Sequence, residues 1–485
     1  MTMQVRAALA GALLLAGCTA GPDYHRPPVD MPVSWTVEAP FRIGEPSDTL
    51  TKGVWWQRFG DPQLDALETQ ALAASPTLAV ASGRLAQARA QVAAAESALM
   101  PSLGFAGRAA RLKISRDRPL TNYQSPNFST VQNDFAAAMT TSYEIDLAGR
   151  VRRTIEGARA SAEQSAADFE NTRLLLTTEL ATDYYALREL DIELDVVTRA
   201  VALQRRSLDL ATARHDLGAT SGLDVASQQA LLDSTLTQLN VLHRQRSQFE
   251  HAIATLAGTA APSFSLTADI RPLDPPSVPI GVPSDVLERR PDVASAERAM
   301  AAANAQIGVA AAAFYPSIIL SPSYGVESTS LSTLFNASSL LWSLGVSIAQ
   351  PVIDSGRLNA NLDFAKAGYD VTTANYRRVI LTAMQEAEDG IVGLAALERA
   401  SDQAAAAIVS ARRVLDLATA RYEGGVATYL DVITAEQGLL TAERLAAQLR
   451  GQRMLTAVFL VKALGGDWSG QPALAKDTGS TRRLH

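Results

Sequence analysis

The chain contains one unit written twice, and this internal repeat constrains the fold more than any other feature. The stretch Leu-Asp-Leu-Ala-Thr-Ala-Arg at 208–214 recurs letter for letter at 415–421, an offset of 207. Pro76 aligns with Pro291 at an offset of 215, so the first copy carries eight extra residues, all between 102 and 149. An insertion confined to one place indicates a tolerant, exposed loop.

Each copy predicts three helices whose lengths are related. The long helix has no proline and spans 150–217 or 357–424, roughly 100 Å at ~1.5 Å per residue. A glycine-bearing turn and a return helix over 223–258 or 430–464 follow it. The Ala-rich run after Pro76 or Pro291 is a shorter helix of about 25 residues. A short and a return helix stacked end to end nearly match the long one, so we expect them to lie beside it.

Between the short and the long helix the hydrophobic period changes from about 3.6 to about 2 residues, which predicts a β-hairpin in each copy, 102–148 and 317–355. Over 135–147, side chains such as Phe135 and Met139 alternate with small or charged ones. One apolar, aromatic face and one small, polar face are typical of transmembrane β-barrels. A soluble half-buried hairpin would show the same alternation.

Four such strands cannot close a barrel, and an open edge in lipid leaves backbone groups unpaired. The chain must therefore pool its strands with copies of itself. Two copies give eight strands with a filled interior, and three give twelve with room for a pore. The strand pattern alone leaves both numbers open.

The pattern of the N-terminus is typical of a bacterial lipoprotein signal. A basic start, an apolar run over 7–15 and the sequence Leu-Ala-Gly-Cys ending at Cys18 predict a signal peptide over 1–17. These last four residues resemble a lipobox, and Cys18 is the only cysteine in the chain. We therefore expect a covalent lipid on Cys18, such as palmitate. Thr19 stands where an aspartate signals inner-membrane retention, so this resemblance implies the outer membrane. A proline-rich tether over 18–60 follows.

The composition excludes several function classes. A net charge of -7 argues against a general nucleic-acid binder, which needs a basic face. The sequence has no phosphate loop and no His-Glu-x-x-His pair, and His215, His243 and His251 are scattered over predicted helices. We expect no enzyme activity, no metal site and no cofactor other than the lipid.

Several dispersed motifs resemble one family. The resemblance is to the TolC-like outer-membrane efflux lipoproteins, the outer-membrane component of resistance-nodulation-division pumps. It covers nearly all of the mature chain. The matching stretches are Gly-Pro-Asp-Tyr-His-Arg-Pro at 21–27, Trp-Trp at 55–56 before Phe-Gly-Asp-Pro at 59–62, Tyr-Glu-Ile-Asp-Leu-Ala-Gly-Arg at 143–150, and Pro-Ser-Asp-Val-Leu-Glu-Arg-Arg-Pro-Asp at 283–292.

The resemblance implies a membrane α+β fold. In that family three protomers form a twelve-stranded outer-membrane β-barrel, four strands each, continued by a periplasmic barrel of twelve helices and encircled by a mixed belt. Residues 61–74 and 261–288 would form the belt. The resulting domain prediction is a first repeat over 61–265, an equatorial linker over 266–290, a second repeat over 291–466 and a C-terminal tail over 467–485.

The resemblance also implies a gate where the hairpins turn. In the family, aspartates at this place form rings around the periplasmic mouth, and the matching residues are Asp224 and Asp431. The alternative is that each carboxylate only caps its return helix. Ala427 and Thr434 stand where the best-known relative has a gate arginine and a second aspartate. Tyr422 and Arg421 are therefore alternative gate residues.

A periplasmic adaptor protein is expected to dock on the same tips and couple the tube to an inner-membrane pump. The docking residues we predict are Arg214, Gly218, Ser221, Leu223, Gly425, Thr428 and Leu430.

The function predicted from these features is a passive outer-membrane exit duct for drugs and other small toxic compounds. Lipidation and the Arg-Arg-Pro-Asp stretch at 289–292 favour this function. An outer-membrane duct for type I protein secretion is the alternative, and a non-conducting lipoprotein spacer is the third hypothesis.

Overall fold

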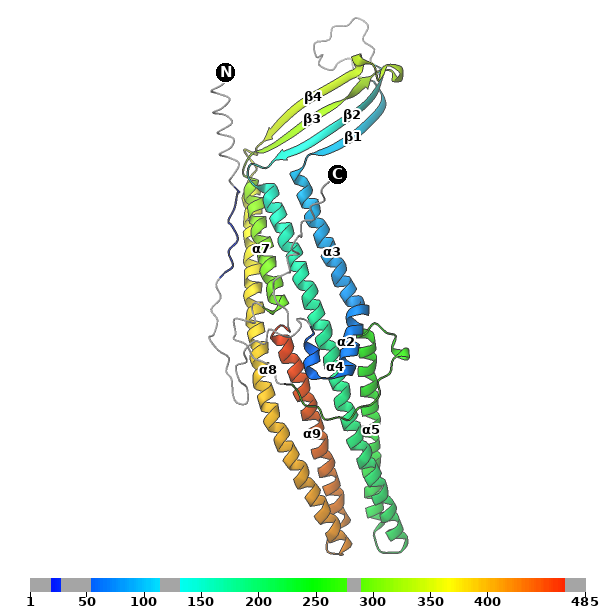
Figure 1. The fold of residues 1–485 in the computed structure, drawn as a ribbon. Helices are drawn as coiled ribbons and strands as arrows, with labels where there is room; N and C mark the ends of the chain where they lie inside the picture. The colour runs from blue at the N-terminus through cyan, green and yellow to red at the C-terminus, as the bar shows by residue number, and fades with distance from the viewer. Residues whose placement is uncertain (1–18, 28–53, 114–130, 277–288, 467–485) are drawn as a thin grey trace, which may run out of the picture. The chain divides into compact units, whose positions relative to one another are not determined.

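A computed structural model describes residues 19–27, 54–113, 131–276 and 289–466 (Figure 1). The predicted signal peptide 1–17, Cys18, the tail 467–485 and most of the surface loop in the first hairpin lie outside the described residues, as do parts of the predicted tether 18–60 and linker 266–290. The predicted tether ends with η1 (Trp55–Phe59). The first repeat contains α2 (Pro62–Ala74), α3 (Pro76–Glu96), η2 (Ser97–Leu99), β1 (Ser102–Lys113), β2 (Val131–Ile145), α4 (Arg150–Asp216), α5 (Gly222–Leu256) and η3 (Ala261–Ser263).

Nearly all positions equivalent to α2, residues 277–288, lie outside the described residues. The described part of the second repeat contains corresponding long elements. They are α7 (Pro291–Ala312), β3 (Ser317–Ser328), β4 (Leu340–Ala349), α8 (Arg357–Glu423) and α9 (Tyr429–Ala463). Each long helix has 67 residues and each return helix has 35. Strand β2 begins at Val131, earlier than the alternation at 135 predicts, because its pairing with β1 continues to Lys113. No helix in the described part of the chain is long and apolar enough to cross a membrane.

The chain forms two compact units, and each unit takes segments from both repeats. The described part of unit 1 comprises residues 19–27, 85–113, 131–165 and 296–376, and unit 2 comprises the remainder. Each predicted repeat, 61–265 and 291–466, therefore contributes segments to both units. The physical reason is that strands and helices of one repeat pair with those of the other, so neither repeat buries its apolar surface alone.

Unit 1 contains a four-stranded antiparallel sheet in the order β1-β2-β3-β4 (Figure 1). The register places Phe105, Met139, Tyr324 and Trp342 in one row across the sheet. This apolar face is open in the single chain, where Phe105 is 73% exposed. The opposite face carries mostly small residues, and β1 and β4 each leave one edge unpaired within the sheet.

An aspartate caps each long helix where it leaves the sheet. The Asp146 carboxylate accepts hydrogen bonds from the backbone N–H groups of Val151 and Arg152, both at 3.0 Å. Asp354 accepts from the N–H of Leu358 at 2.7 Å. These bonds satisfy the free donors of the first helical turn.

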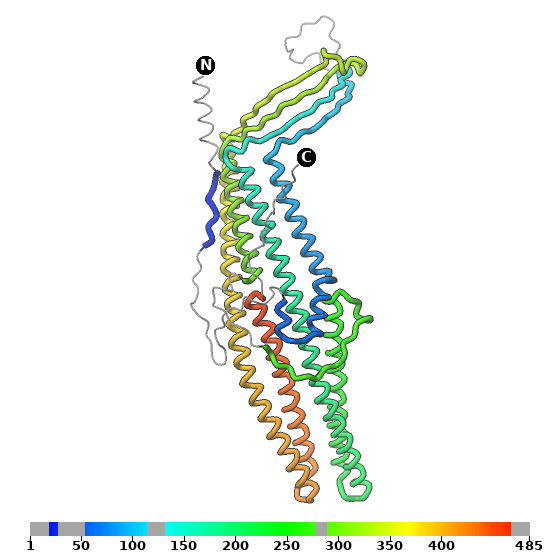
Figure 2. Tube along the Cα trace, in the orientation of Figure 1, coloured from blue at the N-terminus to red at the C-terminus, as the bar shows by residue number. Residues whose placement is uncertain are grey.

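Unit 2 contains two helical hairpins, α4 with α5 and α8 with α9 (Figure 2). Leucines and valines of α4 pack with Leu242 of α5 and Leu440 of α9, so one apolar cluster joins both hairpins.

Segments of the predicted belt fasten to the middle of α4. The Tyr184 hydroxyl donates to Asp61 at 2.8 Å, just before α2. Arg188 donates to the carbonyl of Thr267 at 2.8 Å, and Asp191 accepts from the N–H of Asp269 at 3.0 Å. Belt segments before and after the first hairpin are thus hydrogen-bonded to the same helix.

Candidate functional site

The hairpin tips in unit 2 are the first candidate site, and both turns have the same backbone. Gly218 and Gly425 follow the long helices with φ of 72° and 73°, a left-handed conformation that glycine adopts at little cost. The N–H of Ala219 bonds the carbonyl of Arg214 at 2.8 Å, and the N–H of Val426 bonds that of Arg421 at 3.0 Å. Both hydrogen bonds close the last turn of a long helix.

The two predicted gate aspartates cap the return helices. Asp224 accepts from the N–H of Ser221 at 3.3 Å, and Asp431 accepts from the N–H and the hydroxyl of Thr428 at 3.1 and 3.2 Å. The Ser221 hydroxyl in turn accepts from the N–H of Leu223 at 3.1 Å. Both aspartates therefore cap their helices, as the capping alternative predicts, and a role of these carboxylates at a gate stays a prediction.

The second hairpin reaches the first through an aromatic pair. Tyr422 and Tyr429 have ring centroids 5.0 Å apart, and the guanidinium of Arg214 lies 5.1 Å from the Tyr422 centroid. The Tyr429 hydroxyl donates to Gln228 at 3.2 Å and lies 3.4 Å from the carbonyl oxygen of Ser207. Of the predicted site residues, Tyr422 and Arg214 are thus in contact, whereas Arg421 lies exposed on the last turn of α8.

A buried polar cluster continues from this pair and was not predicted from the sequence. Glu436 on α9 accepts from the hydroxyl of Ser207 on α4 at 2.9 Å, and Gln228 on α5 donates to the carbonyl of Gln204 at 3.2 Å. Burial raises the pKa of Glu436. Burial, together with the nearby charge of Glu436, raises the pKa of Tyr429 to about 12, so this hydroxyl remains a donor at neutral pH. The one sequence signal for this cluster was the pair of tyrosines, Tyr422 and Tyr429, on either side of the turn.

Large apolar side chains stand free at both tips. Leu217 is 84% exposed, and Leu223, Val426 and Leu430 are also exposed. The predicted docking residues Gly218, Ser221, Gly425 and Thr428 lie in the same two turns and are exposed as well. Apolar side chains that cover no neighbour in the described chain are typical of a contact surface for another molecule.

The described part of the family-like stretch 283–292 has a structural role. The Arg290 side chain is buried and donates to both oxygens of Asp292, at 3.0 and 2.7 Å. It also donates to Glu386 of α8 at 2.7 Å and to the carbonyl of Ala463 of α9 at 3.0 Å. Arg290 therefore fastens the start of α7 to the second hairpin.

Residues 19–27, the N-terminal strap, follow the predicted lipidation position and are bound in unit 1. The Ala20 N–H donates to the carbonyl of Ala148 at 2.9 Å, between β2 and α4. The buried guanidinium of Arg153 donates to the Ala20 carbonyl at 3.2 Å and to Asp23 at 2.8 Å. The start of the strap is thus held where the sheet meets the helices.

Helices of the second repeat hold the rest of the strap. Asn304 donates to the carbonyl of Pro22 at 3.0 Å, and Arg26 donates to the Tyr376 hydroxyl at 3.0 Å. Gly21 has a φ of 87°, and a Cβ added to it would lie 2.5 Å from the Cα of Gly308. Only glycine fits this close approach of two backbones.

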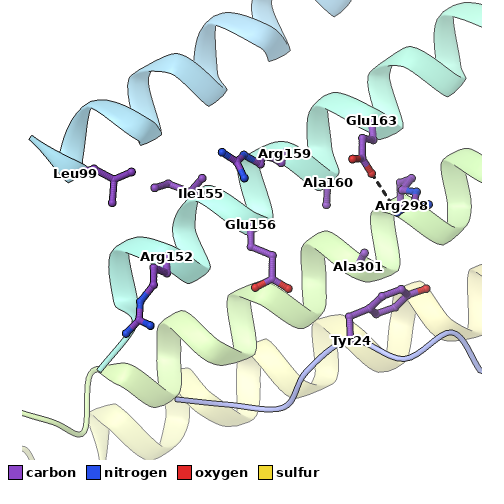
Figure 3. A pocket seen from close by; sticks show the side chains of 10 residues that line it. All are labelled: Tyr24, Leu99, Arg152, Ile155, Glu156, Arg159, Ala160, Glu163, Arg298 and Ala301. Atoms are coloured by element: carbon purple, nitrogen blue, oxygen red, sulfur yellow. Dashed lines mark ion pairs between the residues drawn. The ribbon is translucent and has the colours of Figure 1, made fainter. Parts of the chain in front are cut away.

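A cavity of about 480 Å³ in unit 1 lies beside α4 (Figure 3). Tyr24 of the strap and three arginines line it, but these arginines are ion-paired with carboxylates. Arg298 pairs with Glu163 at 3.1 Å, as Figure 3 shows, and Arg159 pairs with Glu96 at 2.6 Å. No group of side chains suited to a metal ion occurs among the residues that the structure describes.

Comparison with known proteins identifies the family to which this chain belongs. A family model described as outer membrane efflux protein matches residues 67–259 and 282–466, which is most of the chain and both repeats. The chain belongs to the outer membrane efflux protein family. It is 31% identical to the pyoverdine export outer membrane protein OpmQ of Pseudomonas aeruginosa, over 98% of this chain and 100% of that protein. It is also 31% identical to the toluene efflux pump outer membrane protein TtgF of Pseudomonas putida, over 97% and 98% of the two chains.

Solved structures of the family share the fold. The outer-membrane channel OprN superposes with a TM-score of 0.83 at 28% identity, covering 93% of this chain and 99% of that one. The Campylobacter jejuni CmeC outer membrane channel gives 0.84 at 25% identity, covering 94% and 96%. The predicted fold class, a membrane α+β fold in which each protomer of a trimeric channel has four barrel strands and long paired helices, is confirmed. The protein is an outer-membrane component of efflux, and its family consists of channels, not of enzymes.

Proposed function

We propose that this protein is the passive exit duct of a tripartite efflux pump. The observation that carries the proposal is the sheet of unit 1, which has an open apolar face, a small polar face and two unpaired edges. In lipid those edges must be paired, and a neighbouring copy offers the complementary edge. Three copies give twelve strands around a polar interior wide enough for small molecules.

Energy for transport comes from partners in this proposal. A periplasmic adaptor docks on the exposed apolar tips and links the duct to an inner-membrane pump of the resistance-nodulation-division class. The relatives named for toluene efflux, pyoverdine export and antibiotic efflux support small organic compounds, including drugs, as cargo. The duct itself needs neither a catalytic residue nor a cofactor.

The periplasmic mouth is gated at the tips. Asp224 and Asp431, repeated in three copies, narrow the mouth while they cap their helices. Tyr422 lies between Arg214 and Tyr429 and joins the two hairpins of one chain. It takes the place of the gate arginine that the best-known relative has at the position of Ala427. Arg421, exposed beside it, is available to a neighbouring copy.

A lipid on Cys18 anchors the duct. The strap supports this part of the proposal, because residue 19 follows Cys18 directly and Ala20 is bound at the base of the sheet. A lipid at that level would enter the inner leaflet of the outer membrane. We expect a Cys18→Ser variant to lack the mass of the lipid and to give less membrane-inserted trimer than wild type. A Thr19→Ser variant should keep both the lipid and the wild-type yield.

The decisive experiment measures conductance and partner together. Purified protein in planar bilayers should give discrete ion-conducting steps, and their absence would leave the spacer hypothesis. A photo-crosslinking residue at Ser221 or Thr428 should capture an adaptor of a proton-driven pump in living cells. Capture of an adaptor from a type I secretion system would replace the efflux proposal, and capture of no partner would show that the tips are not the docking site.

A further inference from the structure

Three charged side chains form a cluster on the small, polar face of the sheet. Arg108 of β1 is ion-paired with Asp134 of β2 and lies 3.5 Å from a carboxylate oxygen of Glu327 of β3. The cluster therefore spans three of the four strands. It lies towards the sheet end that carries the hairpin connections, where Lys113 pairs with Val131.

The register fixes which face carries these residues. Arg108 is in one row with Ala136 and Glu327, and successive residues along a strand point to opposite faces. Arg108 is three residues from Phe105, so the two side chains lie on opposite faces. Lipid contacts the apolar face of a transmembrane barrel, and the other face lines the interior. The cluster consequently faces the interior of the proposed duct.

The cluster has more acid than base. Two carboxylates face one guanidinium, so each chain contributes one net negative charge. The side chain of Asp134 is 11% exposed and that of Glu327 is 53% exposed, which leaves Glu327 accessible to a passing solute. The other charged residue on this face of the described strands is Glu144, at the far end of β2, and it is paired with Arg150.

We propose that Arg108, Asp134 and Glu327 form a charge-selective ring in the outer part of the duct that favours cationic over anionic solutes. The inference rests on the proposed function, since three copies are needed to close the ring. Rings of charged side chains in a narrow pore set its ion selectivity, because the low-dielectric walls focus the field. Cationic and neutral organic compounds are the cargo class that this ring suits.

The test is a reversal-potential measurement on the full-length lipidated protein in planar bilayers under a potassium chloride gradient. Wild type should favour potassium over chloride. The double variant Asp134→Asn/Glu327→Gln should lower this preference at least about twofold, and Arg108→Gln should raise it. Arg111→Gln is the matched control, because it removes the same charge from the same strand on the opposite face and should leave the ratio unchanged.

The outcomes separate this inference from the proposed function. Absence of conductance in wild type would overturn the duct itself. A conducting trimer whose ion preference is the same in wild type, Glu327→Gln and the double variant would show that the cluster only ties the strands together. If the buried Asp134→Asn change prevents assembly, Glu327→Gln alone decides, because its half-exposed carboxylate can be neutralised without opening the sheet. If Arg111→Gln changed the preference for potassium over chloride as much as the ring variants do, the ring would also be refuted.

Discussion

The two hairpin tips share a backbone and differ in what their side chains contact. At the offset of 207, His215 and Gly222 of the first tip stand where Tyr422 and Tyr429 stand in the second. The His215 ring stays within its own turn, with Nδ1 3.1 Å from the carbonyl oxygen of Thr220. Tyr429 instead lies in a cluster with Ala211 of the first hairpin. The repeat thus preserves the turn, and side-chain differences decide which hairpin holds the other.

A second matched pair shows the same division. Gln229 of the first hairpin is exposed and donates to Asp233 within its own helix at 2.9 Å. Glu436, at the equivalent position of the second hairpin, is buried and bonds Ser207 of the first. In this pair too, the residue of the second hairpin contacts the first hairpin, whereas its equivalent stays within its own helix.

The largest effect should follow removal of the Tyr429 ring. Tyr429→Ala leaves a cavity between the hairpins and should lower the stability of their contact by about 3 kcal/mol. This corresponds to roughly 100-fold less protection of the amides from hydrogen exchange. Hydrogen exchange of the α5 amides over 225–232 measures this loss. Leu223→Ala, at the exposed first tip, is the control and should change protection little. Equal effects of both variants would contradict the asymmetry.

The next effect concerns pH. Because burial raises the pKa of Glu436, the folded hairpins bind its proton more tightly than an unfolded chain does. The contact should be most stable below the ordinary glutamate pKa of 4.5 and lose stability as pH rises towards the raised value. Urea unfolding in detergent, repeated from acidic to neutral pH, measures this loss of stability.

Glu436→Gln should abolish this part of the pH dependence by making the second hairpin resemble the first. Asp233→Asn, an exposed carboxylate on α5, is the matched control and should leave the dependence in place. An unchanged pH profile in Glu436→Gln would assign the titration to another group.

The caps should behave alike at both tips. Asp224→Ala and Asp431→Ala should each cost about 1 kcal/mol of first-turn stability, seen as faster exchange there. Asparagine at either position can still accept the backbone hydrogen bond, so Asp→Asn should preserve most of the protection. A change of bilayer conductance in the asparagine variants would then report the gate charge separately from the cap. Unchanged conductance would limit these carboxylates to capping.

The smallest effect should come from the cation–π contact. Arg214→Gln removes a guanidinium over Tyr422 and should cost about 0.5 to 1 kcal/mol of contact stability. The equivalent arginine of the second hairpin, Arg421, is the control, and its change to Gln should cost less. The same hydrogen-exchange measurement distinguishes them.

Sequence reasoning reached the family, the fold class and the positions of most elements because these depend on local signals. Alternation identified the strands, and the absence of proline identified the long helices. The predicted tip residues lie at the turns for the same reason. The buried contacts of Glu436, Gln228 and Gln204 escaped prediction, because nothing in their spacing distinguishes them from exposed residues on the same helices.

By itself, the sequence determined which segments are helices and strands, where they turn and that the unit occurs twice. Glycine conformation, capping and side-chain periodicity act within a few residues, so they can be read along the chain. Only the tertiary structure decided that each compact unit draws on both repeats, that Arg153 and Gly308 hold the strap, and that Arg108 meets Glu327. Those contacts join residues more than a hundred positions apart, and packing between whole elements selects them.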